Sequence, residues 1–392
     1  MGRLAAWRPA TTPSSRRDPR GVCASDRAIA PARGGTHGAP MTRMTLRPLA
    51  LTLTLSLSPL ACETHPPDTS EELAAALTSR PSFENAVVRE DCPDPGVVRV
   101  DTPAATPRIA FYMTCTGGRF AIRRSTDLVK WTDTGEAIFP DGKPPWASDG
   151  NRNWAPEIHE LGPASFVAYY TASDEHHKLA IGVAYAPHPL GPWTDRGRPL
   201  VQHAIGVIDA TFFADDDGKN FLYWKVDGNQ RGLPTPIMVQ ELGADGRSFA
   251  PRSSPVEVLT NDASSWEGPV VEAPWIVKRD GAYFMFYAGN VYDDRYRTGV
   301  ARAPSPTARF TKSGSPILAN NAKWVGPGHG SVVRAGATDW FVHHAWTTDA
   351  SGQINRGSGR QVLLDAIVWK RDGWPSFAGG SSAIGPGPLP SP

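Results

Sequence analysis

The chain has 392 residues, and its 40 Lys and Arg side chains nearly balance its 39 Asp and Glu side chains, so the formal net charge is +1. A protein that binds nucleic acid needs a basic surface. Neither the net charge nor any basic stripe in the regular part of the chain supplies one, which excludes nucleic acid as a partner and favours a neutral polymer. The 38 Gly, 38 Pro and 13 Trp residues suit many turns and wide apolar sheet faces, which indicates one large all-β domain.

The first 84 residues are predicted to be a leader that lies outside the folded domain. Residues 1–40 are rich in Arg, Ala, Pro and Gly without a periodic apolar pattern, which predicts disorder. Arg43 and Arg47 precede an apolar stretch that ends at Ala61, so a signal peptide is expected at about residues 41–61. Cys62 lies where a bacterial lipoprotein carries its lipid, although Pro59-Leu60-Ala61 departs from the usual approach to that cysteine. We therefore expect an exported protein, either secreted or lipid-anchored at the cell envelope through Cys62, with residues 63–84 as a tether.

One local pattern occurs five times from Asp94 onward: a start of polar or small residues, an apolar strand, a turn and an aromatic-rich second strand. The starts lie at positions 94, 155, 209, 272 and 329, which are separated by 61, 54, 63 and 57 residues. Second strands are predicted at 111–113, 166–170, 221–224, 283–287 and 340–344. A β-rich repeat of this length is typical of propeller blades, whereas an irregular β-sandwich, the alternative, imposes no such period. The sequence predicts an all-β, five-bladed β-propeller as a single catalytic domain over residues 85–378, followed by a flexible Gly/Ser/Pro-rich tail over 379–392.

Two cysteines fall in the first predicted hairpin. Cys92 lies two residues before Asp94, and Cys115 ends the second strand of the same repeat. In an oxidising compartment a disulfide between them would brace the loop that carries Asp94. Two unpaired buried thiols remain the alternative, because sequence does not give the distance between the two residues.

Equivalent strand starts converge around the axis of a propeller, so the residues in this register are expected to face one another. Asp94, Asp209 and Glu272 would point three carboxylates into one channel, with Ala155 leaving room beside them. Carboxylates this close raise one another's pKa values and cost stability, which is a sign of function. Two carboxylates across a channel suit glycoside hydrolysis, in which one protonates the leaving oxygen and the other activates water or attacks carbon. A third carboxylate near the acid is expected to keep that acid protonated near neutral pH.

Seven motifs in order make the chain resemble glycoside hydrolase family 43, the five-bladed propellers that include arabinanases, α-L-arabinofuranosidases and β-xylosidases. The likeness spans about residues 85–375 and rests on Asp94-Pro95-Gly96-Val97-Val98, Ser125 to Trp131, Trp154-Ala155-Pro156-Glu157, Ile208-Asp209, Val271-Glu272-Ala273-Pro274, Gly328-His329-Gly330, and Arg360 before Asp365 and Trp369. The resemblance implies Asp94 as general base, Asp209 as pKa modulator and Glu272 as general acid of an inverting hydrolase. It implies arabinose- or xylose-containing plant cell-wall polysaccharide or oligosaccharide as the substrate, with no required cofactor. Glu267 lies out of the common register and is expected to be a rim or structural residue.

The same resemblance implies further site residues. His329 matches the family's axial histidine, beside which arabinanase-like members hold calcium or sodium largely through water. A structural calcium at His329 and a merely hydrogen-bonded histidine both stay open. Arg360 resembles a substrate-contacting Arg, with a salt bridge inside the fifth repeat as the alternative. Aromatic residues near the strand starts could stack on sugar faces, and the candidates are Trp154, Trp275, Trp146 and Tyr292.

Two other functions are alternatives to hydrolysis by this family. A non-catalytic sugar-binding propeller would share the fold, but it needs hydroxyl partners and not a protonated Glu opposite a base. A fructan hydrolase of a related propeller family would carry Asn-Asp-Pro at the first strand start, which Cys92-Pro93-Asp94 does not match. A monomer is expected, with contact to a membrane only through an anchor at Cys62.

Overall fold

The computed structural model describes residues 81–102, 105 and 107–391. The regular structure in these residues is β-strand apart from three short 3-10 helices. None of the helices in this part of the chain is long and apolar enough to cross a membrane. The predicted disordered segment, signal peptide, Cys62 anchor and most of the tether lie outside the described residues, whereas residues 81–84 at the end of the expected tether are described and include β1 (Ser82–Phe83).

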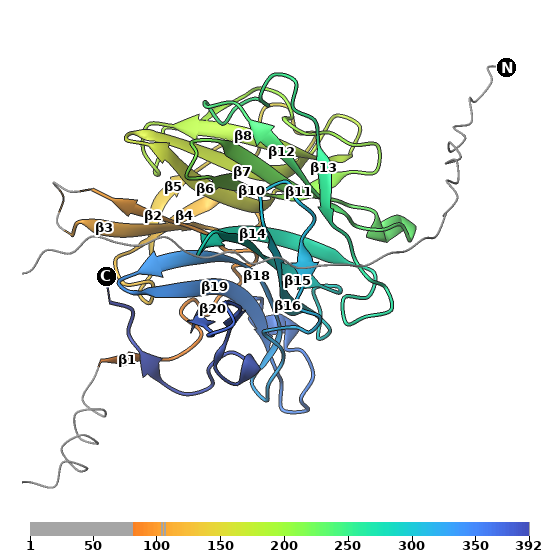
Figure 1. Cartoon of the computed structure of the whole chain (residues 1–392). Coiled ribbons are helices and arrows are strands. Elements are labelled where there is room, and N and C mark those ends of the chain that lie inside the picture. The colour runs from red at the N-terminus through yellow and green to blue at the C-terminus, as the bar shows by residue number, and fades with distance from the viewer. Residues whose placement is uncertain (1–80, 103–104, 106, 392) are drawn as a thin grey trace, which may run out of the picture. The chain divides into compact units, whose positions relative to one another are not determined.

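The described chain forms a five-bladed β-propeller, as predicted (Figure 1). Blade one contains β2 (Gly96–Asp101), β3 (Ile109–Thr114), β4 (Ala121–Ser125) and β5 (Thr132–Ala137). Blade two contains β6 (Trp154–Gly162), β7 (Ser165–Ser173), β8 (Leu179–Ala186) and β9 (Thr194–Asp195). Blade three contains β10 (Val207–Ala214), β11 (Asn220–Val226), β12 (Ile237–Leu242) and β13 (Val256–Leu259). Blade four contains β14 (Val271–Arg279), β15 (Ala282–Gly289), β16 (Arg297–Ala303) and β17 (Thr311–Lys312).

Blade five contains β18 (Trp324–Ala335), β19 (Thr338–Thr347) and β20 (Gln361–Ala366). In every blade, strands that follow one another along the chain pair antiparallel. The five predicted second strands fall in β3, β7, β11, β15 and β19. The remaining elements are β21 (Val368–Trp369), which pairs with β22 (Pro375–Ser376), and the 3-10 helices η1 (Asn229–Arg231), η2 (Arg356–Ser358) and η3 (Ala378–Gly380).

Both ends of the described chain close the ring of blades. Inner strand β18 of blade five contacts inner strand β2 of blade one. The segment before blade one pairs with β20: Val87 donates to the Val362 carbonyl at 2.9 Å, and Val362 donates to the Val88 carbonyl at 2.9 Å. Beside it, β1 (Ser82–Phe83) pairs with β23 (Gly387–Pro388). The N-terminal segment is therefore hydrogen-bonded to the outer edge of the last blade through an isolated bridge at Val88, and this blade lies next to the first in Figure 1.

Residues 379–391, expected as a flexible tail, instead pack against blade five. Backbone groups hold them: Ala383 donates to the Asp365 carboxylate at 3.0 Å, and the Trp324 indole donates to the Ala383 carbonyl at 3.2 Å. The Gly/Ser/Pro composition indicated flexibility because it offers few apolar side chains. The segment is held instead by backbone pairing with β1 and by hydrogen bonds to buried polar side chains, and these interactions do not require apolar side chains in the segment itself.

Every blade places one residue with a positive φ angle at the start of its inner strand. These are Asp94 (φ 55°), Ala155 (43°), Asp209 (56°), Ala273 (55°) and His329 (45°). In blades two to five the position coincides with a break in the ladder register between the inner and second strands. A bulge of this kind changes the direction of one side chain. A left-handed backbone conformation at a residue other than Gly costs about 1–3 kcal/mol, and such strained residues cluster at functional sites.

This register corrects the predicted alignment of blade four by one residue. Ala273, and not Glu272, has the backbone conformation of Asp94 and Asp209. Glu272 is still paired with Ala288 on β15, so it is the last regular residue before the bulge. The structural ring around the axis therefore holds two carboxylates, two alanines and His329, and Glu272 approaches it from the adjoining position.

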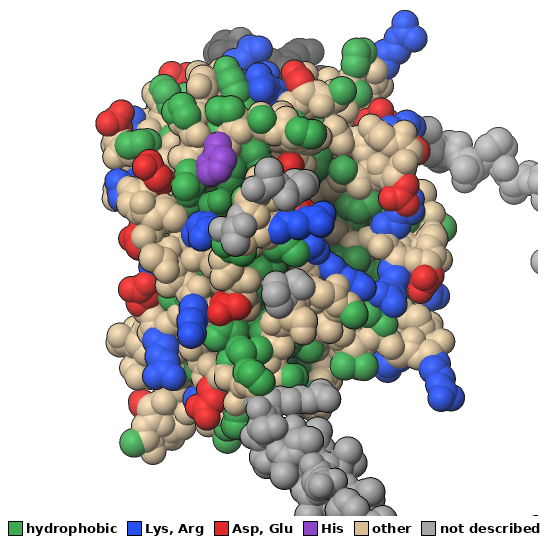
Figure 2. Space-filling view, turned by 90° about the vertical axis from the view of Figure 1, so that its left-hand side faces the viewer, with side chains coloured by type: hydrophobic (Ala, Val, Ile, Leu, Met, Phe, Trp, Pro, Cys, Tyr) green, Lys and Arg blue, Asp and Glu red, His purple; other side chains and the backbone are tan. Residues whose placement is uncertain are grey.

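Apolar layers between adjacent blades hold the ring together. The second strands supply their largest rings, among them the fully buried Tyr170, Tyr223, Phe286 and Phe341. On the face in Figure 2, acidic and basic side chains both occur among apolar ones, in keeping with the near-zero net charge.

Candidate active site

A cavity of about 230 Å³ opens at the propeller axis, and its walls include residues from all five blades. Blade one supplies Asp94 and Thr116, and blade two supplies Trp154. The other residues that carry the argument are Asp209, Lys225, Asp227, Glu272, Tyr292, Tyr296, His329 and Arg360. The three carboxylates predicted to be catalytic therefore meet in one pocket.

Asp94 is held by side chains on both of its oxygens. Oδ1 lies 3.1 Å from His329 Nδ1 and 3.2 Å from a terminal nitrogen of Arg360. Oδ2 accepts a hydrogen bond from the Thr116 hydroxyl at 2.6 Å. Burial alone would raise the pKa of Asp94, but the Arg360 and His329 charges outweigh it and hold that pKa well below its usual range. Asp94 is therefore an ionised, oriented carboxylate.

His344 on β19 fixes the backbone beneath Asp94. The Asp94 N–H donates to His344 Nδ1 at 3.1 Å, so this nitrogen is unprotonated and the ring is the neutral Nε2–H form. Burial lowers the pKa of His344 to about 4, which agrees with a neutral ring. The 3.3 Å approach of His344 Nδ1 to the Asp94 carboxylate is therefore not an ion pair.

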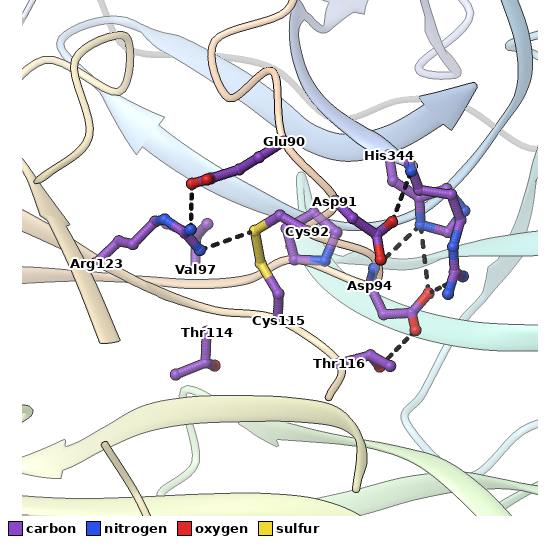
Figure 3. The surroundings of a disulfide bond; sticks show 12 residues. Glu90, Asp91, Cys92, Asp94, Val97, Thr114, Cys115, Thr116, Arg123 and His344 are labelled. Carbon is purple, nitrogen blue, oxygen red and sulfur yellow. Dashed lines mark hydrogen bonds and ion pairs between the residues drawn. A yellow bond between two sulfur atoms is a disulfide. The ribbon is translucent and has the colours of Figure 1, made fainter. Parts of the chain in front are cut away.

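A disulfide supports the same loop. Cys92 and Cys115 are bonded, with Cα atoms 5.2 Å apart, which confirms the bridged alternative. Figure 3 shows the disulfide beside Asp94. Thr116 and His344 each form a hydrogen bond with Asp94. The bridge ties the segment before β2 to the residue that follows β3, and this restrains the loop that carries Asp94.

Asp209 is buried at the bulge of blade three. Its Oδ2 accepts the Ala273 N–H at 3.0 Å, and its own N–H donates to Thr171 Oγ1 at 3.3 Å. Bulged N–H groups have no ladder partner, so side chains of neighbouring blades satisfy them. Burial, with the negative charge of Glu272 adding to it, raises the pKa of Asp209 to about 7.

Glu272 is bound by a cation and a phenol. Its Oε2 lies 2.8 Å from Lys225 Nζ, and its Oε1 accepts the Tyr296 hydroxyl at 2.8 Å. Lys225 is 1% exposed and also pairs with Asp227 at 2.9 Å. A Cβ at Gly328 would lie 2.6 Å from the Tyr296 ring, so glycine there lets Tyr296 reach Glu272.

These contacts reverse the expected direction of one pKa shift. Burial favours a protonated Glu272, but the Lys225 charge at 2.8 Å outweighs it and lowers the pKa of Glu272. The raised pKa belongs to Asp209, which touches no cation directly. The expectation that a third carboxylate keeps Glu272 protonated near neutral pH is therefore wrong for the free site, in which the raised pKa is that of the third carboxylate.

His329 lies among the three carboxylates as a cation. Burial alone would lower its pKa, but Asp94 and Asp209 outweigh burial and raise the pKa of His329 to about 9. A protonated imidazole has no lone pair for a metal. Among the described residues, no group of three or more His, Cys, Asp or Glu side chains is arranged to hold a metal ion. A calcium ion held through water beside His329 stays a prediction, and in the structure the imidazolium supplies positive charge on the axis.

The predicted contact residues divide between the pocket and the core. Arg360 and Trp154 line the pocket, as does Tyr292, whose side chain is 58% exposed. Trp275 does not: it follows the bulge, pairs with Phe286, and its ring centroid lies 5.6 Å from that of His159. Its ring therefore packs between blades and is not free to stack on a sugar in this pocket.

Two more of the singled-out residues are structural. Trp146 stacks on Tyr170 and donates to its hydroxyl at 3.1 Å. Glu267 is 1% exposed, accepts from the Tyr287 hydroxyl at 2.7 Å and pairs with Lys312. Glu267 does not reach the pocket, which agrees with its expected structural role.

Sequence reasoning missed four residues that touch the carboxylates, namely Thr116, Lys225, Tyr296 and His344. Lys225 had a visible signal, since it is a charged residue inside the apolar run Phe221 to Val226. His344 was noted only as the end of a second strand. Tyr296 follows an acidic loop, and nothing in its local sequence indicates that it turns back to Glu272.

Comparison with known proteins agrees with this geometry. The family model for glycosyl hydrolases family 43 matches residues 83–375, so the chain belongs to that family. A beta-D-galactofuranosidase of Aspergillus niger is 31% identical over 245 residues, covering 58% of this chain and 66% of that protein. An extracellular exo-alpha-(1->5)-L-arabinofuranosidase of Streptomyces avermitilis is 27% identical over 297 residues, covering 68% of this chain and 58% of that protein.

A solved thermostable family-43 glycoside hydrolase matches 78% of this chain and 99% of its own, with 27% identity and a TM-score of 0.67. The chain spans about two thirds or less of the length of the Aspergillus and Streptomyces relatives. The match to the solved hydrolase, by contrast, covers nearly all of that chain.

Proposed function

We propose that the chain is an exported, inverting glycoside hydrolase that cleaves arabinose- or xylose-containing polysaccharide or oligosaccharide, with α-L-arabinofuranosides and arabinan favoured. The observation that carries the proposal is the convergence of Asp94, Asp209 and Glu272 in one pocket that all five blades line. The extracellular arabinofuranosidase among the relatives supports both the substrate class and export.

Asp94 is the proposed general base. Its low pKa keeps it ionised, and Thr116 and Arg360 fix the orientation of its oxygens. In this role Asp94 takes a proton from a water molecule as that water attacks the anomeric carbon. Arg360 also lines the pocket, so its remaining donors suit sugar hydroxyls.

Glu272 is the proposed general acid, and Asp209 is the group that shares its proton. Below about pH 7 the free pair holds one proton, which resides mainly on Asp209 because Lys225 stabilises the Glu272 anion. The competent form carries that proton on Glu272, which gives it to the leaving oxygen while Asp209 becomes ionised. Asp209 thus sets the pH range in which a proton is present, through charge rather than by touching the sugar.

The experiment combines a substrate panel with three matched variants. The wild-type chain should release nitrophenol from aryl α-L-arabinofuranoside or β-D-xyloside and sugar from arabinan oligosaccharides. On the oligosaccharides, Asp94→Asn and Glu272→Gln should each lower turnover by about 10³-fold or more. Glu267→Gln, a buried carboxylate outside the pocket, should keep most of the activity of the folded protein.

Two results would contradict the proposal. Sugar binding without turnover across the whole panel would favour a non-catalytic carbohydrate-binding propeller. If Glu267→Gln lost as much activity as Glu272→Gln, with both variants folded, the assignment of Glu272 as the general acid would be wrong.

A further inference from the structure

We propose that a second, basic cavity beside the active-site pocket binds a carboxylate-bearing sugar residue of the substrate. This cavity has a volume of about 230 Å³. It shares Trp154, Asp227 and Gln230 with the active-site pocket, so the two spaces adjoin. The inference rests on the proposed function, because a glycan that enters one space can extend into the other.

Three basic side chains line this cavity. Arg152 precedes β6 and Lys178 precedes β8, both in blade two, while Arg231 lies in η1 of blade three. None of the three forms an ion pair with another residue in the part of the chain that the structure describes. Arg152 is positioned by a hydrogen bond of 3.2 Å to the His177 carbonyl, which leaves the rest of its guanidinium free. The cavity therefore presents positive charge that the protein itself does not neutralise.

The three acidic groups nearby have other partners. Asp149 lies 3.8 Å from His177 and accepts the Asn151 N–H at 2.8 Å. Asp227, the one carboxylate among the described lining residues, is 2.9 Å from Lys225 Nζ. Asp174, next to the loop that carries Lys178, accepts from the Lys178 N–H at 2.9 Å and from Gln202. None of these carboxylates pairs with the three cations, so the cavity keeps its basic character.

An anionic group attached to the glycan fits these observations. A neutral pentose has no charge to pair with a guanidinium, whereas a carboxylate accepts two parallel hydrogen bonds from one. In a polysaccharide that carries arabinose or xylose, this charge comes from a uronic acid. Glucuronate and galacturonate present the same carboxylate, and Trp154, at the junction, offers a ring face for the sugar that links the two spaces.

The test compares two oligosaccharides that differ only in a carboxyl group. One carries the cleavable sugar next to a uronate, and the other is its carboxyl-reduced, neutral counterpart. The wild-type chain should hydrolyse the uronate substrate with a kcat/KM about fivefold higher, the size expected from two exposed charge pairs. Arg152→Gln combined with Arg231→Gln should abolish this preference and leave the neutral substrate unchanged. Lys130→Gln combined with Arg371→Gln, which removes two exposed charges elsewhere, should keep it.

The outcomes separate this inference from the proposed function. Equal rates on both substrates, or a preference that survives in the Arg152/Arg231 double variant, would overturn the basic site while hydrolysis itself stands. If neither substrate is cleaved, the proposed function fails. Calorimetric binding of the same two oligosaccharides then tests whether the basic cavity binds the carboxylate. The inference requires that the uronate form binds more tightly and that the double variant loses this gain in affinity. Substrates with glucuronate and with galacturonate, run in parallel, identify the source.

Discussion

Replacing Asp209 by Asn should move the alkaline limb of the pH–rate profile down by more than two pH units. In the wild-type chain the last proton of the Asp209 and Glu272 pair is lost at about pH 7, the raised pKa of Asp209. In the variant only Glu272 titrates, and Lys225 at 2.8 Å holds its pKa below the ordinary 4.5. At pH 6.5 fewer than about 1 in 100 Glu272 side chains would then be protonated. Asp94, whose pKa is well below 3.8, stays ionised throughout and keeps the base active.

The assay is kcat/KM between pH 3.5 and 9 on an oligosaccharide or alkyl glycoside, because a good aryl leaving group hides the need for an acid. Glu267→Gln serves as the control, since it removes a buried carboxylate outside the pocket and should leave the limb near pH 7. An Asp209→Asn profile that overlies the wild-type one, with measurable activity and an intact fold, would refute the shared proton.

Three further predictions follow from the contacts of the site. Lys225→Met removes the cation that lowers the pKa of Glu272, so the alkaline limb of the pH–rate profile should move up in pH. The same variant leaves Asp227 without its partner, which should lower the free energy of unfolding in denaturant by about 3–5 kcal/mol. The pKa of His329 is about 9 in the folded protein against an ordinary 6.5, so its contribution to folding stability is complete below pH 6.5 and is lost as the pH rises through 9. His329→Gln should remove about 3 kcal/mol of this pH dependence of the free energy of unfolding. An unchanged slope of stability against pH would contradict a charged His329. Cys92→Ser combined with Cys115→Ser should lower the free energy of unfolding by about 3 kcal/mol for a closed loop of this length, and a reducing agent should no longer affect the urea midpoint.

Sequence alone located the blades and the three carboxylates, because strand starts, turns and aromatic second strands repeat along the chain. The predicted register of blade four is one residue too early, because it puts Glu272 and not Ala273 at the strand start. The backbone conformation that defines the register belongs to Ala273, and a φ angle of 55° at Ala leaves no mark in the sequence. The error did not lose Glu272 as a pocket residue, because the adjoining position also faces the pocket.

The electrostatics could not be read from the sequence for a different reason. The pKa values of Asp209 and Glu272 depend on which of them touches Lys225, and that contact joins blade three to blade four across 47 positions. Trp275 was misplaced on similar grounds: after the bulge, its ring turns toward His159 in the inter-blade packing. Contacts between blades, and not motifs within them, decide both cases.

Proton NMR of the first-formed sugar tests the central claim most directly. With Asp94 as a base that activates water and Glu272 as the acid, hydrolysis is a single displacement, so the product released before mutarotation should have the anomeric configuration opposite to that of the substrate. Release of the sugar with the substrate's own configuration, or a glycosyl ester trapped on Asp94, would show that Asp94 attacks carbon and would contradict the account.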